Sequence, residues 1–197
     1  MKGQDANDAL IADLQRRVAS APRRPVASFD KPKTYEPATP SDIAKVEKKL
    51  GFALPPLLRR VYGEVADGGF GPFYGIYSLK KYPGAAQEQT LGEAYEVLTS
   101  GDWPEPRLLP IIEWGDAIWS CLDCRRDDGP MVTVSEEASF VATDYDLAGW
   151  LRAWLDGVDL WAAMFEPAKP QMRRNPFTGE LAPFPAEIGK PKGKPFP

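Results

Sequence analysis

The sequence predicts an α+β fold in which helices pack on a mainly antiparallel sheet, with a meander over residues 107–142 at its centre. Four short apolar runs separated by turn residues indicate the strands of this meander: 107–114, 117–123, 131–134 and 139–142. Gly115-Asp116 is typical of a two-residue hairpin turn, and Asp128-Gly129 predicts the next turn. Amphipathic segments on both sides of the meander supply helices to cover the sheet.

The first helix of the domain is expected to begin after Thr39. Thr39 is a favoured N-cap residue, Pro40 suits the first helical position, and Asp42 can return a hydrogen bond to the cap. Gly51 is expected to end this helix, because glycine readily adopts the left-handed conformation that follows a helix. Two more amphipathic segments predict helices after residues 54–56 and over residues 91–98.

The last predicted helix spans residues 147–155, capped by Thr143 with Asp146, and its apolar face is wide enough to cover a sheet. Residues 70–79 are aromatic and rich in glycine, and we expect a strand there. Residues 6–19 predict a short amphipathic helix. The sequence leaves open whether this helix docks on the domain or forms an independent arm.

These patterns divide the chain into three parts. Residues 1–38 form an N-terminal helical arm with a proline-containing linker, residues 39–166 form the domain, and residues 167–197 form a basic, proline-rich tail. Eight of the last 31 residues are proline, so the tail is not expected to form a core of its own.

The charge is unevenly distributed along the chain. Residues 34–166 carry 11 Lys and Arg but 22 Asp and Glu, a net charge of −11, whereas residues 1–33 carry +3 and residues 167–197 carry +4. An acidic domain with basic ends either serves solubility or attracts a basic partner. This charge disfavours specific nucleic-acid binding by the domain, since such binding depends on basic surfaces.

Composition excludes several kinds of active site. The chain has no histidine, which excludes Ser-His-Asp and Cys-His sites, and its two cysteines are too few for a disulfide framework. No apolar run approaches the roughly 20 residues of a membrane span, and the N-terminus lacks the pattern of a signal peptide. We therefore expect a cytoplasmic protein with no membrane association, no cofactor and no catalytic residues.

Two groups of residues suggest a metal site, and the sequence argues against both. Cys121 and Cys124 have the Cys-x-x-Cys spacing, but no other Cys or His is present to complete four zinc ligands. Residues three apart on a strand also point to opposite faces, which favours structural roles for the two thiols. Asp123, Asp127 and Asp128 lack the pattern of a calcium loop, and Asp-Asp-Gly is ordinary turn chemistry. No metal site is predicted.

Aromatic and acidic residues around the predicted hairpin are the candidates for contact with a partner. Large aromatics beside acids are typical of the hot spots of protein interfaces. Trp119 is expected to pack in the core, whereas Trp103 lies in a predicted loop and is the better surface anchor. The predicted partner-binding residues are Trp103, Glu113, Asp116, Asp127 and Asp128.

The order of these elements resembles the SUKH superfamily, and in particular its Smi/Knr family, over about residues 39–157. The resemblance is carried by the helix pair over 43–55, the turn at Gly68-Gly69, the segments 113–115, 119 and 122–123, and the closing helix with Trp150-Leu151. It implies a SUKH-like α+β fold and no shared catalytic residues.

Many bacterial members of that superfamily are thought to be immunity proteins that neutralise a toxin, often a nuclease, and others are scaffolds in signalling. The resemblance therefore implies a protein-binding module, not an enzyme. Its partner would be a basic protein, a toxin domain encoded nearby. A scaffold without a toxin partner is the alternative.

Overall fold

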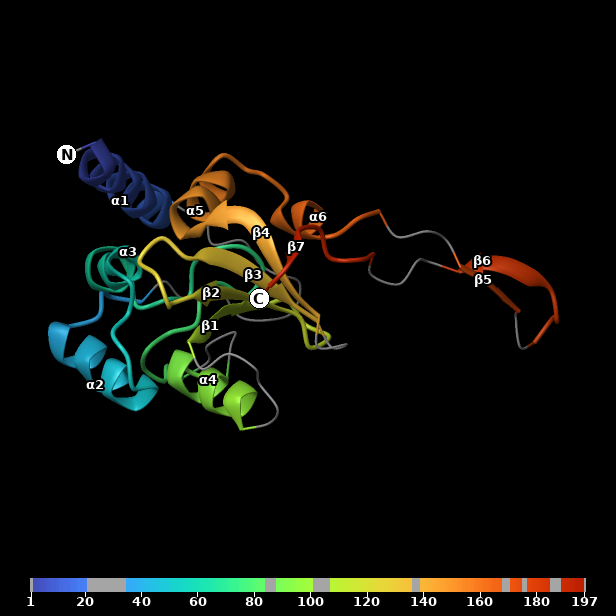
Figure 1. The fold of residues 1–197 in the computed structure, drawn as a ribbon, viewed down its shortest axis with the longest axis horizontal. Coiled ribbons are helices and arrows are strands. Elements are labelled where there is room, and N and C mark those ends of the chain that lie inside the picture. The colour runs from blue at the N-terminus through green and yellow to red at the C-terminus, as the bar shows by residue number, and fades with distance from the viewer. Residues whose placement is uncertain are drawn as a thin grey trace.

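An antiparallel sheet with the strand order β1-β2-β3-β4-β7 forms the centre of the fold (Figure 1). The computed structural model describes residues 2–20, 35–83, 88–100, 107–135, 139–167, 171–174, 177–184 and 189–196. The first four strands form the predicted meander: β1 (Leu108–Glu113), β2 (Trp119–Asp123), β3 (Pro130–Val134) and β4 (Phe140–Asp146). The predicted α+β fold with a central antiparallel meander is thereby confirmed.

The turn between β1 and β2 contains three residues, not the predicted two. Gly115, Asp116 and Ala117 have φ angles of 85°, 49° and 54°, and the N–H of Trp114 donates to the carbonyl of Ile118 over 2.8 Å. Because Ala117 belongs to the turn, β2 begins later than the predicted strand at residue 117. Alanine rarely adopts the left-handed conformation, so Ala117 could not be recognised as a turn residue from the sequence.

Helices surround the sheet largely as predicted. They are α2 (Pro40–Leu50), α3 (Pro56–Arg60), the π-helix η1 (Val61–Val65), α4 (Leu91–Thr99), α5 (Leu147–Leu155) and the unpredicted α6 (Leu160–Met164). The predicted capping box of Thr39 and Asp42 is present at α2. At α5 the cap is Asp146, which accepts a hydrogen bond from the N–H of Gly149, while Thr143 lies within β4.

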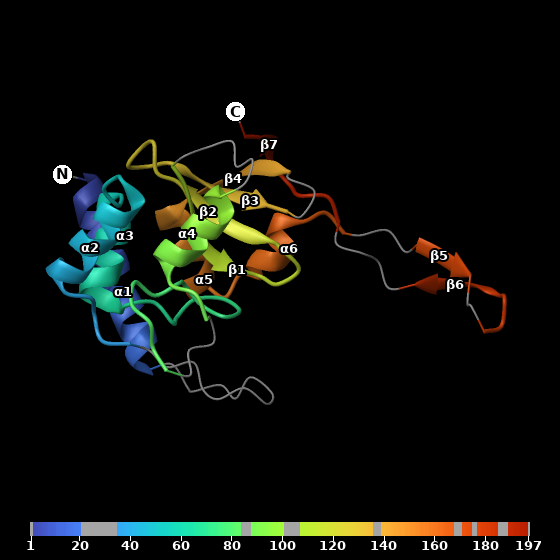
Figure 2. The ribbon, with the colours of Figure 1, turned by 90° about the horizontal axis from the view of Figure 1, so that it is seen from below.

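The N-terminal helix α1 (Lys2–Ser20) docks on the domain. Leu10, Ile11 and Leu14 are buried against the main core, and α1 packs on η1 and α5. Ion pairs of 2.6 Å join Arg60 to Asp8 and Arg152 to Asp13. Figure 2 shows α1, α2 and α3 grouped on the same side of the sheet. The first of the two alternatives left open by the sequence is therefore the observed one.

The expected strand in residues 70–79 is wrong. The chain folds back on itself there: the N–H of Gly69 donates to the carbonyl of Ile76 over 2.9 Å, and that of Ile76 to Phe70 over 2.7 Å. Gly68 permits this, since its φ is 75° and a Cβ atom would lie 2.7 Å from the carbonyl oxygens of Ile76 and Tyr77. The loop contacts the sheet through the N–H of Tyr77, which donates to Ile111 of β1 over 3.0 Å.

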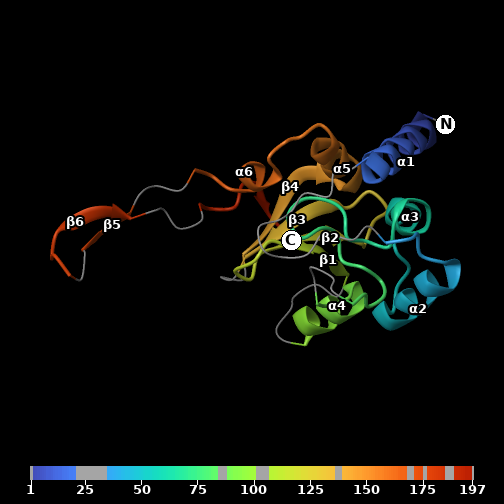
Figure 3. The ribbon, with the colours of Figure 1, turned by 180° about the vertical axis from the view of Figure 1, so that it is seen from behind.

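The C-terminal tail leaves the domain and returns to it. Strands β5 (Gln171–Arg174) and β6 (Leu181–Phe184) form a hairpin arm that projects from the side opposite α2 and α3 (Figures 1 and 3). Residues 190–196, the C-terminal strap, then run back past α6, where the N–H of Lys192 donates to Met164 over 2.7 Å. Strand β7 (Lys194–Pro195) pairs with Val141 and Ala142 of β4.

The strap crosses from one face of the sheet to the other. Lys192 lies beside α6, whereas Phe196 packs with Trp119 and Phe140 on the opposite face. Gly193 allows the crossing, because its φ is 142° and a Cβ atom there would lie 2.1 Å from the carbonyl oxygen of Ala142.

Cys121 and Cys124 are buried and unbonded, and they lie on opposite faces of the sheet, as predicted. Burial raises the pKa of both thiols. Within the described ranges, no three Cys, Asp or Glu side chains gather as metal ligands would. Each helix in the described part of the chain is too short or too polar to cross a lipid bilayer.

Candidate functional site

The structure separates the predicted contact acids into two pairs at opposite ends of β2. In an antiparallel meander successive turns lie at opposite ends of the sheet. Glu113 ends β1 and Asp116 lies in the β1–β2 turn, whereas Asp127 and Asp128 lie in the β2–β3 turn. The four acids therefore do not form one cluster. Trp103, the predicted anchor, lies outside the described residues.

Glu113 is half-buried beside an aromatic pair. Its Oε2 accepts a hydrogen bond of 3.1 Å from the hydroxyl of Tyr77, and it faces Trp119 across the strands. Burial raises the pKa of Tyr77, and the charge of Glu113 raises it further. The Tyr77 hydroxyl therefore keeps its proton and holds the Glu113 carboxylate in a fixed position.

Arginines offset the acids at the other end of the sheet. Arg125 pairs with Asp123 through two hydrogen bonds of 2.9 and 3.0 Å, and Arg126 pairs with Asp128 at 3.0 Å. The Arg125 guanidinium also lies 4.7 Å from the ring centroid of Phe196 in the strap. The local field of this turn is consequently weaker than its three acids suggest.

An exposed pair of aromatic side chains lies near the β1–β2 turn. Phe73 and Tyr74 are 56% and 39% exposed and meet edge to face, with ring centroids 4.1 Å apart. Phe73 also stacks on Trp114, the residue before the turn, at 6.1 Å. We call Phe73, Tyr74, Trp114 and Asp116 the aromatic end of the molecule.

Trp114, the buried member of the aromatic end, packs in a row of aromatic rings that continues into α6. Trp114 is only 8% exposed and lies 5.8 Å from Trp161 of α6, which in turn lies 4.8 Å from Phe165. The indole N–H of Trp114 donates to the hydroxyl of Ser120 over 2.8 Å. Because Trp114 is fixed in this way, the ring of Phe73 rests on a rigid base.

The backbone at Phe73 is strained. Its φ is 50°, a left-handed conformation that is rare for a bulky residue and costs about 1–3 kcal/mol. Strained residues concentrate at functional sites, where the surrounding structure maintains them. An exposed, strained aromatic side chain on a fixed base is a suitable anchor for a protein interface.

Sequence reasoning missed Phe73 and Tyr74, because it assigned residues 70–79 to a strand. A strand would have buried alternate side chains in the sheet. Gly71 and Gly75, which bracket the pair and both have positive φ, were the available signal for a loop.

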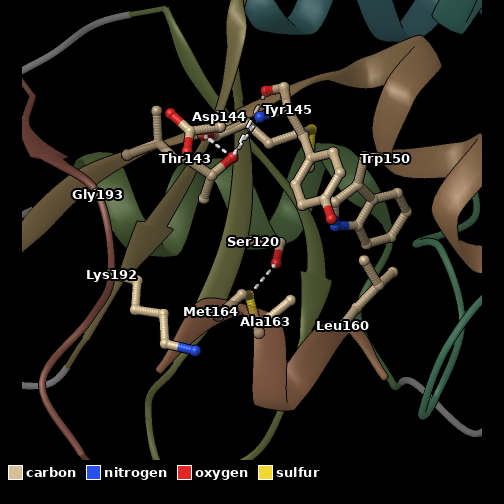
Figure 4. Close-up of a pocket in the computed structure, with 12 residues that line it drawn as sticks. Ser120, Thr143, Asp144, Tyr145, Trp150, Leu160, Ala163, Met164, Lys192 and Gly193 are labelled. Carbon is tan, nitrogen blue, oxygen red and sulfur yellow. Dashed lines mark hydrogen bonds between the residues drawn. The ribbon is translucent and has the colours of Figure 1, made fainter. Parts of the chain in front are cut away.

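A second feature of the described residues is a pocket between β4, α6 and the C-terminal strap (Figure 4). It has a volume of about 190 Å³. Apolar side chains of Met131, Leu160 and Met164 line it, together with the indole of Trp150. Figure 4 shows Trp150 on one side of the pocket and Lys192 of the strap on the other.

Comparison with known proteins identifies the family. No curated protein matches the sequence. The sequence model of the SMI1 / KNR4 family (SUKH-1) matches residues 37–152, a range that begins just before α2 and ends within α5, and thus includes the four-stranded meander and the aromatic end. Family and fold agree with the resemblance drawn from the sequence, and the chain belongs to the SMI1 / KNR4 family (SUKH-1).

Proposed function

We propose that this protein is an immunity-type binding module, which neutralises a basic toxin domain by covering its functional surface. The observation that carries the proposal is the aromatic end: an exposed, strained Phe73 fixed on Trp114 beside the acidic β1–β2 turn. Membership of a family with immunity-type members supports it. No catalytic chemistry is part of the proposal, and the binding takes place in the cytoplasm of the producing cell.

Charge supports a basic partner. A net charge of −11 over residues 34–166 attracts a basic surface over long distances and raises the association rate. A toxin that cleaves nucleic acid needs a basic cleft to bind phosphates, and an acidic protein can occupy that cleft. The aromatic end then supplies the short-range contacts that slow dissociation.

In this proposal the predicted contact acids have unequal roles. Asp116 is exposed at the tip of the turn and belongs to the centre of the interface, with Glu113 close behind it. Asp128 contributes less, because Arg126 pairs with it at 3.0 Å. Asp127 contributes less because it lies in the β2–β3 turn, at the other end of β2 from the aromatic end. Trp103 is proposed as a further anchor.

A scaffold role without a toxin partner is the second candidate. It is favoured by the β5–β6 arm, which exposes Met172 and Leu181 and projects away from the sheet. A short hairpin of two strands is marginally stable in water, so such an arm gains stability by lying against another protein.

The test is to measure binding of the toxin domain encoded next to this chain, using Phe73→Ala and a matched control. We expect Phe73→Ala to weaken binding about thirtyfold, because loss of a hot-spot aromatic costs about 2 kcal/mol or more. The control is Val97→Ala on α4, since Val97 is 57% exposed, close to the 56% of Phe73, but is not part of the aromatic end. Val97→Ala should leave affinity unchanged.

Association rates test the charge argument separately. Asp116→Asn should slow association and reduce its salt dependence more than Asp127→Asn does. If the toxin domain binds with equal rates to both variants, the aromatic end is not the centre of the interface. If no neighbouring gene product binds and the chain protects no cell, the immunity role is wrong and the scaffold role takes its place.

A further inference from the structure

The pocket beneath the strap has the size of a small-molecule site. Its volume of about 190 Å³ exceeds that of an engineered protein cavity of about 150 Å³ that binds benzene. Apolar side chains from two elements form its floor and walls: Met131 of β3, and Leu160 and Met164 of α6. A compact apolar body, such as one aromatic ring, fits these dimensions.

The pocket contains a buried donor without an acceptor. Trp150 is 1% exposed, and among the described residues no group accepts a hydrogen bond from its Nε1–H. The indole of Trp114, which is also buried, does have an acceptor in Ser120. Because buried polar groups are nearly always hydrogen-bonded, the indole N–H of Trp150 is a donor that an acceptor bound in the pocket would satisfy.

A cation lies on the other side of the pocket. The ammonium of Lys192 donates one hydrogen bond, to the carbonyl of Ala162 over 3.0 Å, and has three donors in all. Figure 4 shows its side chain reaching from the strap toward α6, across the pocket from Trp150. Asp144 also lines the pocket and is exposed, so it repels an anionic group from its own part of the rim.

We propose that this pocket binds a small organic acid with a hydrogen-bond acceptor at one end of a compact apolar body and a carboxylate at the other. The acceptor meets the Trp150 indole in the interior, and the carboxylate meets Lys192 at the strap. A neutral group in the interior and a charged group near solvent is the orientation that limits desolvation. The pocket is a different site from the proposed toxin interface, although Ser120 both lines the pocket and accepts the hydrogen bond of Trp114.

The pocket exists only when the strap is docked on the domain. Lys192 and Gly193 form part of the wall, and they are held by the hydrogen bond of Lys192 to Met164 and by the pairing of β7 with β4. Without the strap, the pocket loses both a wall and its cation. Binding of the acid therefore stabilises the docked strap, and release of the strap abolishes binding.

The experiment uses three probes with the full chain labelled with ¹⁵N: 4-hydroxybenzoate, benzoate, which lacks the acceptor, and phenol, which lacks the carboxylate. The indole N–H signal of Trp150, assigned through Trp150→Phe, reports occupancy of the pocket. We expect 4-hydroxybenzoate to bind about tenfold more tightly than either of the others, since each loses one hydrogen-bonding group.

Two variants assign each group of the ligand to its partner. Trp150→Phe keeps an aromatic ring but removes the donor, and the indole signal with it, so binding to this variant is followed by the backbone N–H signals of the pocket residues Met164 and Gly193. In this variant 4-hydroxybenzoate should bind no better than benzoate. In Lys192→Met, it should bind no better than phenol. Thermal unfolding of each variant confirms that it is folded, so that a loss of binding is not mistaken for a loss of structure.

The strap is tested with Gly193→Ala, which places a Cβ atom against Ala142 and should abolish binding of 4-hydroxybenzoate. Gly179→Ala is the matched control, because Gly179 also has positive φ but has no atom within 4 Å of its Cβ position, and it lies in the arm. The proposal is overturned if no probe shifts the Trp150 indole signal, or if Lys192→Met leaves the preference for 4-hydroxybenzoate over phenol unchanged.

Discussion

Two carboxylates at helix N-termini illustrate how single residues stabilise this fold. Asp42 has a pKa of about 2, chiefly because the Thr39 hydroxyl and Lys80 hydrogen-bond to its charged form. Glu93 also has a pKa of about 2, because Lys81 and the backbone N–H of Thr90 bind its carboxylate. A carboxyl group whose pKa is lowered by folding stabilises the native state at pH values above its unfolded pKa, and this contribution is lost as pH falls toward the native pKa.

The consequence is testable with Glu93→Gln. Glutamine keeps an acceptor for Thr90 but cannot be ionised, so the variant should lose less stability than the wild type as pH falls from about 4.5 to about 2. Denaturant unfolding at several pH values in this range measures the difference. Thr90→Ala is the control: it removes the cap itself and should cost about 1 kcal/mol at neutral pH. Parallel pH curves for Glu93→Gln and the wild type would contradict this account.

At the scale of helices and strands, the elements that could be predicted are those that depend on a local sequence pattern. The strand runs, the capping box at Thr39 and the helix over 147–155 follow from periodicity and cap chemistry, which neighbouring residues determine. Gly71 and Gly75 indicate a loop around Phe73, but the shape of that loop could not be predicted in this way, since it depends on the close approach of Gly68 to residues 76–77. The free N–H of Trp150 was likewise hidden, because the tail that lines its pocket is distant in sequence.

The β1–β2 turn offers a prediction at this scale. Ala117 has a φ of 54°, which costs an alanine about 1 kcal/mol or more, whereas glycine adopts this conformation freely. Ala117→Gly should therefore stabilise the domain by about 0.5 kcal/mol, after subtraction of the greater entropy of glycine in the unfolded chain. The denaturant midpoint gives the change. The same substitution at Ala153, inside α5, should destabilise by about 1 kcal/mol, and an equal loss at both positions would refute the turn geometry.

At the scale of the whole molecule, α1 and the domain share one hydrophobic core. Leu14 is completely buried, the helix packs on η1 and α5, and ion pairs join it to α3 and α5. The sequence alone did not distinguish docking from independence, because an amphipathic pattern shows that a helix has an apolar face and not which surface covers it.

Leu14→Ala should destabilise the entire domain by about 3 kcal/mol, the middle of the range for a leucine removed from a core. Thermal unfolding should remain a single transition at a lower temperature. Arg16→Ala, on the exposed side of α1, should change stability by no more than about 0.5 kcal/mol. A separate low-temperature transition in the Leu14→Ala variant would mean that α1 unfolds independently of the sheet.

The C-terminal tail returns to the domain close to where it leaves, and this arrangement determines where the chain can accept inserted residues. The N–H of Glu166 donates to the carbonyl of Lys190 over 2.8 Å, so the chain leaves and re-enters the domain at nearly the same place. The arm between them is thus an insertion whose ends are already joined. Doubling the length of a flexible loop costs only about 0.6 kcal/mol in closure entropy. Residues 167–189 are therefore where new sequence, even a whole foreign domain, can be added while the sheet and its strap stay in place.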